Sequence, residues 1–137
     1  MKIIIAIMVV SALFAGCLSE KNTQEKKDVI LDLEPSSINL KSGEVKQVKI
    51  RVNNSGISGI NPVVRFNVNS SDKPYLNFTP GSYDLGYLRP GEDSGFRLVD
   101  VRATLAAGEE IKYHARAQVI YNGKVFDSKD LIVTVAR

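Results

Sequence analysis

Strict alternation of apolar and polar residues is the feature of this sequence that most constrains its fold. The longest run spans residues 111–121, and shorter runs cover 48–52, 64–68, 99–105 and 131–135. A period of two places successive side chains on opposite faces of a strand, one face buried and the other solvated. Beyond the N-terminal region, no window has the 3.6-residue period of an amphipathic helix. The sequence therefore predicts an all-β domain.

Glycine-containing turns separate these runs. Asn122-Gly123 lies between two of them, and Asn-Gly is the strongest short signal for a two-residue β-hairpin, because both central residues need positive φ. The motif Leu-x-x-Gly-Glu occurs three times, at residues 40–44, 88–92 and 105–109. We expect one turn geometry with an inward leucine at all three. The adjacent apolar residues Leu98 and Val99 break the alternation and predict a β-bulge.

Seven or eight short strands without helices favour an antiparallel two-sheet β-sandwich. The chain also resembles the immunoglobulin-like domains of archaeal and bacterial surface proteins, including the cell-adhesion-related CARDB group. The resemblance spans Val29 to Val135. It is carried by Leu40-x-x-Gly43-Glu44, Val48-x-Ile50-x-Val52-Asn53-Asn54-x-Gly56 and Leu88-x-Pro90-Gly91-Glu92. It implies an immunoglobulin-like sandwich on a prokaryotic cell surface and favours an archaeal host.

The N-terminus has the three parts of an export signal. Lys2 supplies a positive charge, residues 3–14 are almost entirely apolar, and two small residues precede Cys17. The apolar run is shorter than the roughly 20 residues that a membrane-spanning helix needs. Leu13-Phe14-Ala15-Gly16-Cys17 resembles the lipobox of bacterial and archaeal lipoproteins, which implies cleavage before Cys17 and attachment of lipid to its thiol. An ordinary signal peptide and an uncleaved anchor remain alternatives, and both place the rest of the chain outside the cytoplasm.

We expect three segments: a signal peptide at 1–16, the lipidated cysteine with a flexible stalk at 17–28, and an immunoglobulin-like domain at 29–137. The stalk is too polar to bury the apolar surface that would offset its ordering entropy. Cys17 is the only cysteine, which leaves the domain without a disulfide. The expected location is the outer face of the cytoplasmic membrane, with Cys17 anchored in membrane lipid.

Residues suited to catalysis or metal binding are sparse. His114, the only histidine, lies between Lys112 and Arg116 and has no carboxylate nearby in the sequence. One histidine and one cysteine do not suffice for a zinc site. Calcium needs only oxygen ligands, but no loop has the closely alternating acidic residues of a calcium-binding loop. The candidate carboxylates are Asp84, Glu92, Asp93, Asp100, Asp127 and Asp130. We therefore predict no catalytic residue, metal or cofactor; an enzyme that uses carboxylates alone is the least favoured alternative.

Three sets of residues are candidates for binding or modification. Segment 73–87 concentrates rings that suit a sugar face or a protein partner: Tyr75, Phe78, Tyr83 and Tyr87. Outward basic side chains on two strands of one sheet suit an anionic polymer or lipid head groups: Arg65, Lys112 and Arg116, with His114. Sequons offer N-glycan acceptors: Asn53, Asn69 and Asn77. Alternatively, the rings cap the sandwich edges, and Asp127 and Asp130 neutralise the basic face.

These observations favour a non-catalytic binding or adhesion module that contacts an envelope protein or a surface glycan. The alternative is a structural accessory subunit of a membrane transport or secretion complex. Nucleic acid is not an expected partner, because a net charge of +3 with acids and bases mixed along the chain forms no clustered basic stripe.

Overall fold

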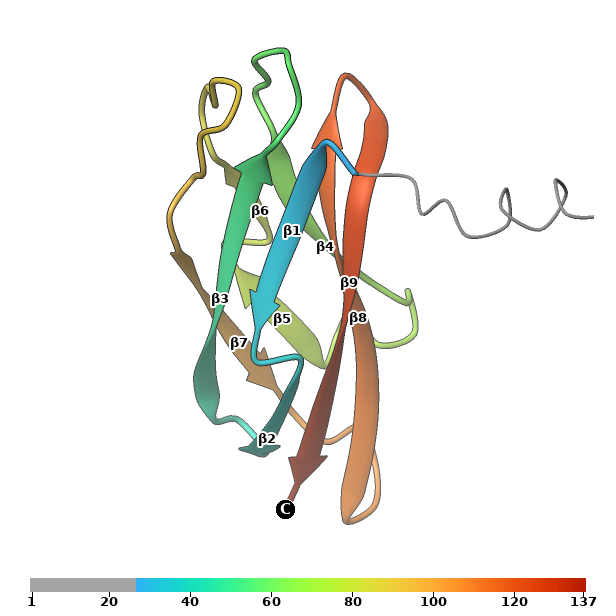
Figure 1. Cartoon of the computed structure of the whole chain (residues 1–137). Helices are drawn as coiled ribbons and strands as arrows, with labels where there is room; N and C mark the ends of the chain where they lie inside the picture. The colour runs from blue at the N-terminus through green and yellow to red at the C-terminus, as the bar shows by residue number, and fades with distance from the viewer. Residues whose placement is uncertain (1–26) are drawn as a thin grey trace, which may run out of the picture.

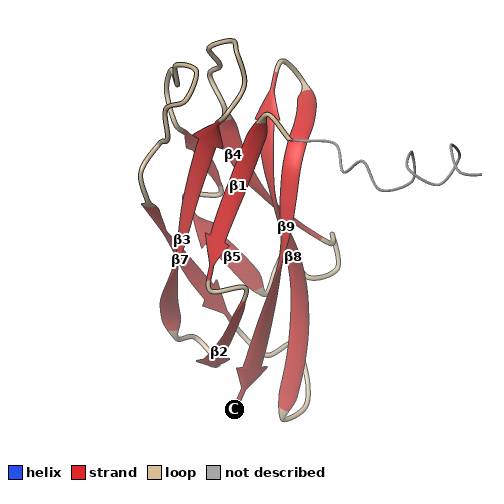
Figure 2. Ribbon diagram, in the orientation of Figure 1, coloured by secondary structure: helices blue, strands red, loops and turns tan. Residues whose placement is uncertain are grey.

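The computed structural model describes residues 27–137; the predicted signal peptide, Cys17 and most of the predicted stalk lie outside these residues. The described part of the chain is a β-sandwich without a helix, and hence without one that could cross a membrane (Figures 1 and 2). Its strands are β1 (Val29–Glu34), β2 (Ser37–Lys41), β3 (Val45–Asn54), β4 (Val63–Val68), β5 (Leu76–Thr79), β6 (Ser82–Asp84), β7 (Arg97–Ala103), β8 (Glu110–Tyr121) and β9 (Lys124–Ala136).

Four strands form one sheet in the order β1-β3-β7-β5, and five form the other in the order β2-β9-β8-β4-β6. The predicted two-sheet sandwich is confirmed, although β2 and β9 run parallel while the other neighbours are antiparallel. The parallel pair arises because the chain changes sheets at Pro35 and Ser36. Splitting the first strand in this way, together with the three-residue β6, raises the number of strands above the seven or eight expected.

The alternating pattern builds the core between the sheets. On β3, Val48, Ile50 and Val52 are fully buried, whereas Lys49 between them is exposed. The pattern continues on β8 and β9, where inward residues pack against the opposite sheet: Tyr113, Ala115, Ala117, Val119, Leu131, Val133 and Val135. One face of each sheet is therefore left as an outer surface.

Two of the three Leu-x-x-Gly-Glu motifs form the same turn. In the first, Lys41 N–H donates to the Glu44 carboxylate at 2.7 Å, and Glu44 N–H donates back to the Lys41 carbonyl. Arg89 and Glu92 repeat both bonds in the second motif. The glycines have φ of +84° and +79°, which Gly tolerates and other residues rarely adopt.

The expectation that the third motif shares this geometry is wrong. Leu105 is only partly buried, and Ala106 N–H donates to the hydroxyl of Tyr113 instead of to a glutamate. Tyr113 also donates to the Thr104 carbonyl at 2.8 Å, which fastens β8 to the loop that precedes it. This arrangement is the tyrosine corner of immunoglobulin domains. The alternation predicted that Tyr113 faces inward but not this bond.

The hairpin prediction is confirmed and the bulge prediction is wrong. Asn122 and Gly123 have φ of 51° and 71°, as a two-residue hairpin requires. The β3–β7 register is continuous past Leu98 and Val99, because Leu98 simply lies on the solvated face. The irregularity falls on β8 instead, where the β8–β9 register shifts beyond Val119.

Candidate binding surfaces

The outer face of the five-stranded sheet carries a shallow hollow of about 410 Å³. Its polar lining comes from three adjacent strands and the turn after β4: Asn67, Asn69, His114, Arg116, Gln118 and Asp130. We call these six residues the polar sheet face. Pairing places them together, because Asn67 lies opposite Arg116 on β8 and Arg116 opposite Asp130 on β9.

Most hydrogen bonds on the polar sheet face are made within it. Arg116 Nε donates to Asp130 Oδ1 at 3.0 Å, and the Asn67 amide donates to the Gln118 side chain. Both members of the ion pair are more than half exposed, so the pair contributes little to stability, about 0–1 kcal/mol. A ligand can therefore replace these bonds at small cost to the fold. The face offers amide, guanidinium and carboxylate groups to a polar partner.

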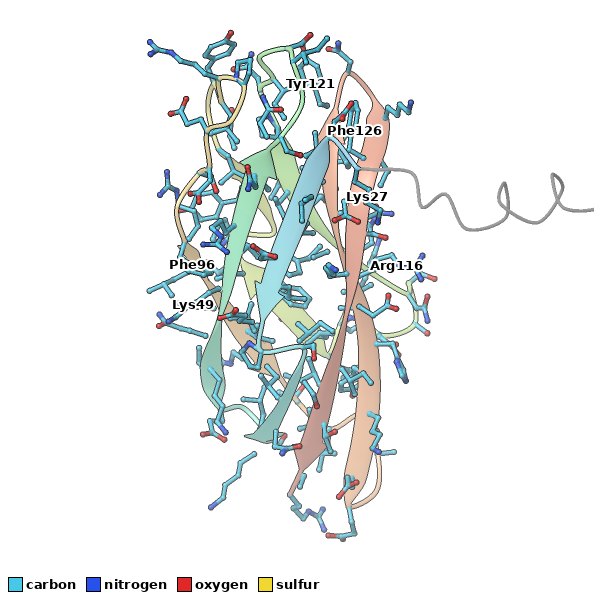
Figure 3. The ribbon with its side chains drawn as sticks, in the orientation of Figure 1. Lys27, Lys49, Phe96, Arg116, Tyr121 and Phe126 are labelled. Atoms are coloured by element: carbon cyan, nitrogen blue, oxygen red, sulfur yellow. The ribbon has the colours of Figure 1, made fainter. Side chains whose placement is uncertain are left out.

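The predicted basic residues share this sheet. Arg65 lies opposite Gln118 and Lys112 opposite Thr134, and both are exposed. Of the two acids expected to neutralise the face, only Asp130 does so, through Arg116 (Figure 3).

Asp127 points inward instead, beside the free edge of β1. Its carboxylate accepts hydrogen bonds from Leu31 N–H at 2.9 Å, Lys27 Nζ at 2.7 Å and Ser128 N–H at 2.9 Å. Burial by itself raises the pKa of Asp127, but these hydrogen bonds and the charge of Lys27 outweigh it, so the pKa lies below its ordinary value. Asp127 therefore joins the edge of one sheet to a strand of the other.

The four predicted aromatic residues do not form one surface. Tyr75 stacks on Tyr113 with ring centroids 6.5 Å apart, and Phe78 stacks on Phe66 at 4.4 Å. These rings and Tyr83 pack against the core from its rim. Only Tyr87 among the four is largely exposed. The alternative in which the rings cover the sandwich edges describes the positions of the first three.

The sequon asparagines differ in accessibility. Asn69 and Asn77 are exposed, whereas Asn53 is half-buried and its backbone bridges to Asp93. The neighbouring Asn54, which the sequence pointed to only as part of the motif at residues 48–56, is 1% exposed. Its position continues the inward parity of β3, and a polar residue at an inward position is the signal that would have identified it.

The outer face of the four-stranded sheet holds a second cluster. The ring of Phe96 lies 4.6 Å from the Arg51 guanidinium and 5.8 Å from Lys49 Nζ (Figure 3). Arg51 also donates to Asp32 at 2.8 Å, and this hydrogen bond raises the pKa of the guanidinium. In this second cluster, both cations lie near the Phe96 ring, and Arg51 is also paired with Asp32.

Within residues 27–137, no three His, Cys, Asp or Glu side chains are grouped to hold a metal ion. Four of the calcium candidates accept hydrogen bonds from separate turns or strands: Asp84 from Gly86, Glu92 from Arg89, Asp93 from Gly95 and Asp100 from Gln47. His114, which lines the polar sheet face, is opposite Ile132 rather than a carboxylate.

No known family's sequence profile matches the chain, and no curated protein matches it in sequence. Solved structures match it by fold. The CARDB domain of the PF1109 protein from Pyrococcus furiosus, a complex with di-metal ions, has a TM-score of 0.55 and 19% identity over 83% of this chain and 92% of that domain. Native α2-macroglobulin from E. coli has a TM-score of 0.55 and 17% identity over 79% of this chain.

A third match is a chain from the chaperone–tip adhesin complex of CFA/I fimbriae biogenesis, with a TM-score of 0.50 and 12% identity over 77% of this chain. This protein spans only 6% of the macroglobulin and 55% of the fimbrial chain. At such identities the matches establish the fold, a CARDB-like, immunoglobulin-like β-sandwich.

Proposed function

We propose that this protein is a non-catalytic binding module, held at the outer face of the cytoplasmic membrane by lipid on Cys17, that contacts an envelope protein or a surface glycan. The polar sheet face is the observation that carries the proposal. It combines a hollow with polar side chains, among which the exposed Arg116–Asp130 pair contributes little to the stability of the fold. The CARDB domain and the chaperone–adhesin chain share this type of sandwich, which is consistent with a binding role.

The anchor part of the proposal rests on sequence. Cys17 is the only cysteine and directly follows an apolar run that ends in two small residues. A sandwich without a disulfide must be stabilised outside the cell by its hydrophobic core alone. The fully buried side chains of both sheets form such a core.

Affinity capture of the full-length protein from gently solubilised native membranes tests both parts. We expect an Arg116→Ala variant to recover roughly tenfold less partner, because truncating a central polar anchor commonly costs more than 1 kcal/mol of binding. Arg102→Ala, which changes another exposed arginine on the outer face of the other sheet, should recover as much as the native chain. Equal recovery by both variants would remove the polar sheet face from the proposal.

The mass of the N-terminal peptide of the captured protein tests the lipid anchor: a lipid-modified Cys17 supports the anchor, and an unmodified Cys17 contradicts it. Recovery of a transport or secretion component in near-equal amount would favour the accessory-subunit alternative. If no protein is recovered, we expect envelope glycan fractions to bind the native chain and not Arg116→Ala. Hydrolytic turnover that His114→Ala abolishes would overturn the non-catalytic assignment.

A further inference from the structure

One end of the sandwich presents apolar side chains to solvent. We call it the entry end, because the start of β1 lies there, opposite the C-terminus (Figure 1), and so does Lys27 (Figure 3). It consists of the loops at 55–62 and 85–96 and the hairpin turn at 121–124. Ile57 is 97% exposed at the tip of the first loop, and Tyr87 is 59% exposed in the second.

The two loops are held as one unit from below. The buried Asn54 amide donates to the carbonyls of Ser58, Leu88 and Arg89 at 2.8–3.2 Å, and Asn54 Oδ1 accepts from Gly56 N–H. Ile60 and Leu88 also exchange two backbone hydrogen bonds, of 3.0 and 2.8 Å.

Tyr87 contacts the first loop directly, since its hydroxyl end occupies the space that a Cβ on Gly59 would need. The exposure of Ile57 and Tyr87 is thus built into a fixed platform. A single exposed apolar residue is common, but a connected group on one end marks a contact surface.

An apolar cleft of about 220 Å³ extends this surface toward the hairpin. Ile57 and Ile60 line one side, and Tyr121 and Phe126 line the other (Figure 3 labels both aromatic residues). Val125 beside them is 46% exposed. Lys124 Nζ lies 5.5 Å from the Phe126 ring centroid, so the apolar ring is accompanied by an ammonium group. Aromatic and aliphatic groups with polar tips are suited to the boundary between water and lipid.

The charges of the entry end are mixed. Arg89 and Lys124 are exposed bases, whereas Lys27 is bound to Asp127. Two of the acids here bind nearby backbone, since the Glu92 carboxylate accepts from Arg89 N–H and Asp93 accepts from Gly95 N–H. A third, the exposed Asp28, lines the rim of the cleft beside Gly56. No strong field of one sign results, which indicates apolar contact rather than attraction to anionic lipid.

The short chain between Cys17 and the entry end indicates which partner this end contacts, namely the lipid bilayer. Lys27 is the tenth residue after Cys17, and ten residues of chain span at most about 35 Å. The far end of a sandwich with a thirteen-residue β9 lies roughly 40 Å further away. A tether this short keeps the entry end at a high local concentration near the lipid, so that a weak contact is sufficient.

We propose that the entry end docks on the bilayer surface, with Ile57, Tyr87 and the Tyr121–Phe126 hairpin in the head-group region. The inference rests on the proposed lipidation of Cys17. It orients the sandwich with its long axis away from the membrane and the polar sheet face open to partners at the side.

The chain contains no tryptophan, so an introduced tryptophan is a single reporter. We would reconstitute full-length lipoprotein carrying Ile57→Trp into phosphatidylcholine vesicles with brominated acyl chains. Ala107→Trp, in an exposed loop at the opposite end, is the matched control. We expect blue-shifted emission and severalfold stronger bromine quenching for Ile57→Trp, and solvent-like, unquenched emission for Ala107→Trp.

A second reporter separates docking from any affinity of tryptophan for lipid at position 57. Val125→Trp should be quenched in the native background, and the quenching should be lost when Ile57→Asp is added. Unchanged quenching of Val125→Trp after that substitution would contradict the proposed role of Ile57.

The mass of the N-terminus distinguishes the two proposals. Lipidated protein with an unquenched Ile57→Trp reporter would overturn docking and leave the anchor intact, whereas unlipidated native protein would overturn both. Equal quenching of the two end reporters would show a sandwich that lies flat and would overturn the orientation. A blue shift that grows with protein density without bromine quenching would assign the entry end to a second copy of the chain.

Discussion

The two ends of the sandwich satisfy their loop backbones in different ways. At the entry end, buried side chains beneath the loops form the bonds: the Asn54 amide holds two loops, and the Asp127 carboxylate holds the edge of β1. At the opposite end, which comprises the loops at 42–44 and 104–109 and the C-terminus, the Tyr113 hydroxyl and the exposed Ser42 and Glu44 side chains form these bonds instead. The Gly-Glu turn is common to both ends, at residues 40–44 and 88–92.

The difference explains why the two ends present different surfaces. Loops that are bonded from below need no polar residues at their tips, so Ile57 and Tyr87 can face solvent. The opposite end carries charge at its rim, where Arg137 Nη1 lies 3.2 Å from Glu109 Oε1. The backbone N–H and C=O groups of both sets of loops need hydrogen-bond partners. Where buried side chains provide them, the residues at the loop tips can be apolar.

The largest expected effect comes from Asn54→Ala. It removes three donated bonds and one accepted bond at a site that is 1% exposed, so we expect a loss of about 3 kcal/mol in the free energy of unfolding. Urea titration measures it. Asn53→Ala is the control, because the Asn53 side chain makes no hydrogen bond within the described residues, and it should stay within about 0.5 kcal/mol. Similar losses for both would show that Asn54 does not hold the entry end.

Asp127→Asn should cost about 2 kcal/mol at pH 7, because it weakens the hydrogen bonds that this buried side chain accepts from Lys27 and Leu31. The folded state lowers the pKa of Asp127, so its contribution is complete above the unfolded-state pKa of about 3.9 and is lost as the pH falls through the folded-state value. The gap between native and variant stability should therefore close below about pH 4.

Urea titrations at several pH values measure this gap. Lys27→Met should cost less, under about 1 kcal/mol, because Lys27 is 60% exposed and solvent screens its charge. A gap that does not change with pH would mean that Asp127 is not the titrating group.

Of the three buried polar side chains, the one at the opposite end, Tyr113, should show the smallest effect. Tyr113→Phe keeps the ring stacked on Tyr75 but removes the hydroxyl that serves Thr104 and Ala106, at a cost of about 1 kcal/mol. Hydrogen exchange should speed up in the 104–109 loop and stay unchanged in the 55–62 loop. Tyr75→Phe, whose hydroxyl has no partner within residues 27–137, is the control. Faster exchange at both ends would contradict the view that the ends are held independently.

Much of the fold was predictable because its determinants are local. The alternating runs gave the strands and their inward faces, and Asn122-Gly123 specified a hairpin through its positive φ. The bulge predicted at Leu98 is absent because an outward leucine next to an inward valine has the same sequence pattern as a bulge. The candidate site was predictable only in part: Arg65, Lys112 and Arg116 do share a sheet, but the hollow around Arg116 depends on Asn67 and Asp130 from neighbouring strands.

Local sequence patterns are enough to place the strands and to identify the side chains that they bury, because periodicity and turn φ act over a few residues. The roles of Asn54 and Asp127 depend on long-range contacts, since their partners Leu88 and Leu31 are 34 and 96 residues away in the chain. A buried polar group is stable only where folding brings its partner within hydrogen-bonding distance. That meeting depends on how the sheets pack, which no local pattern encodes.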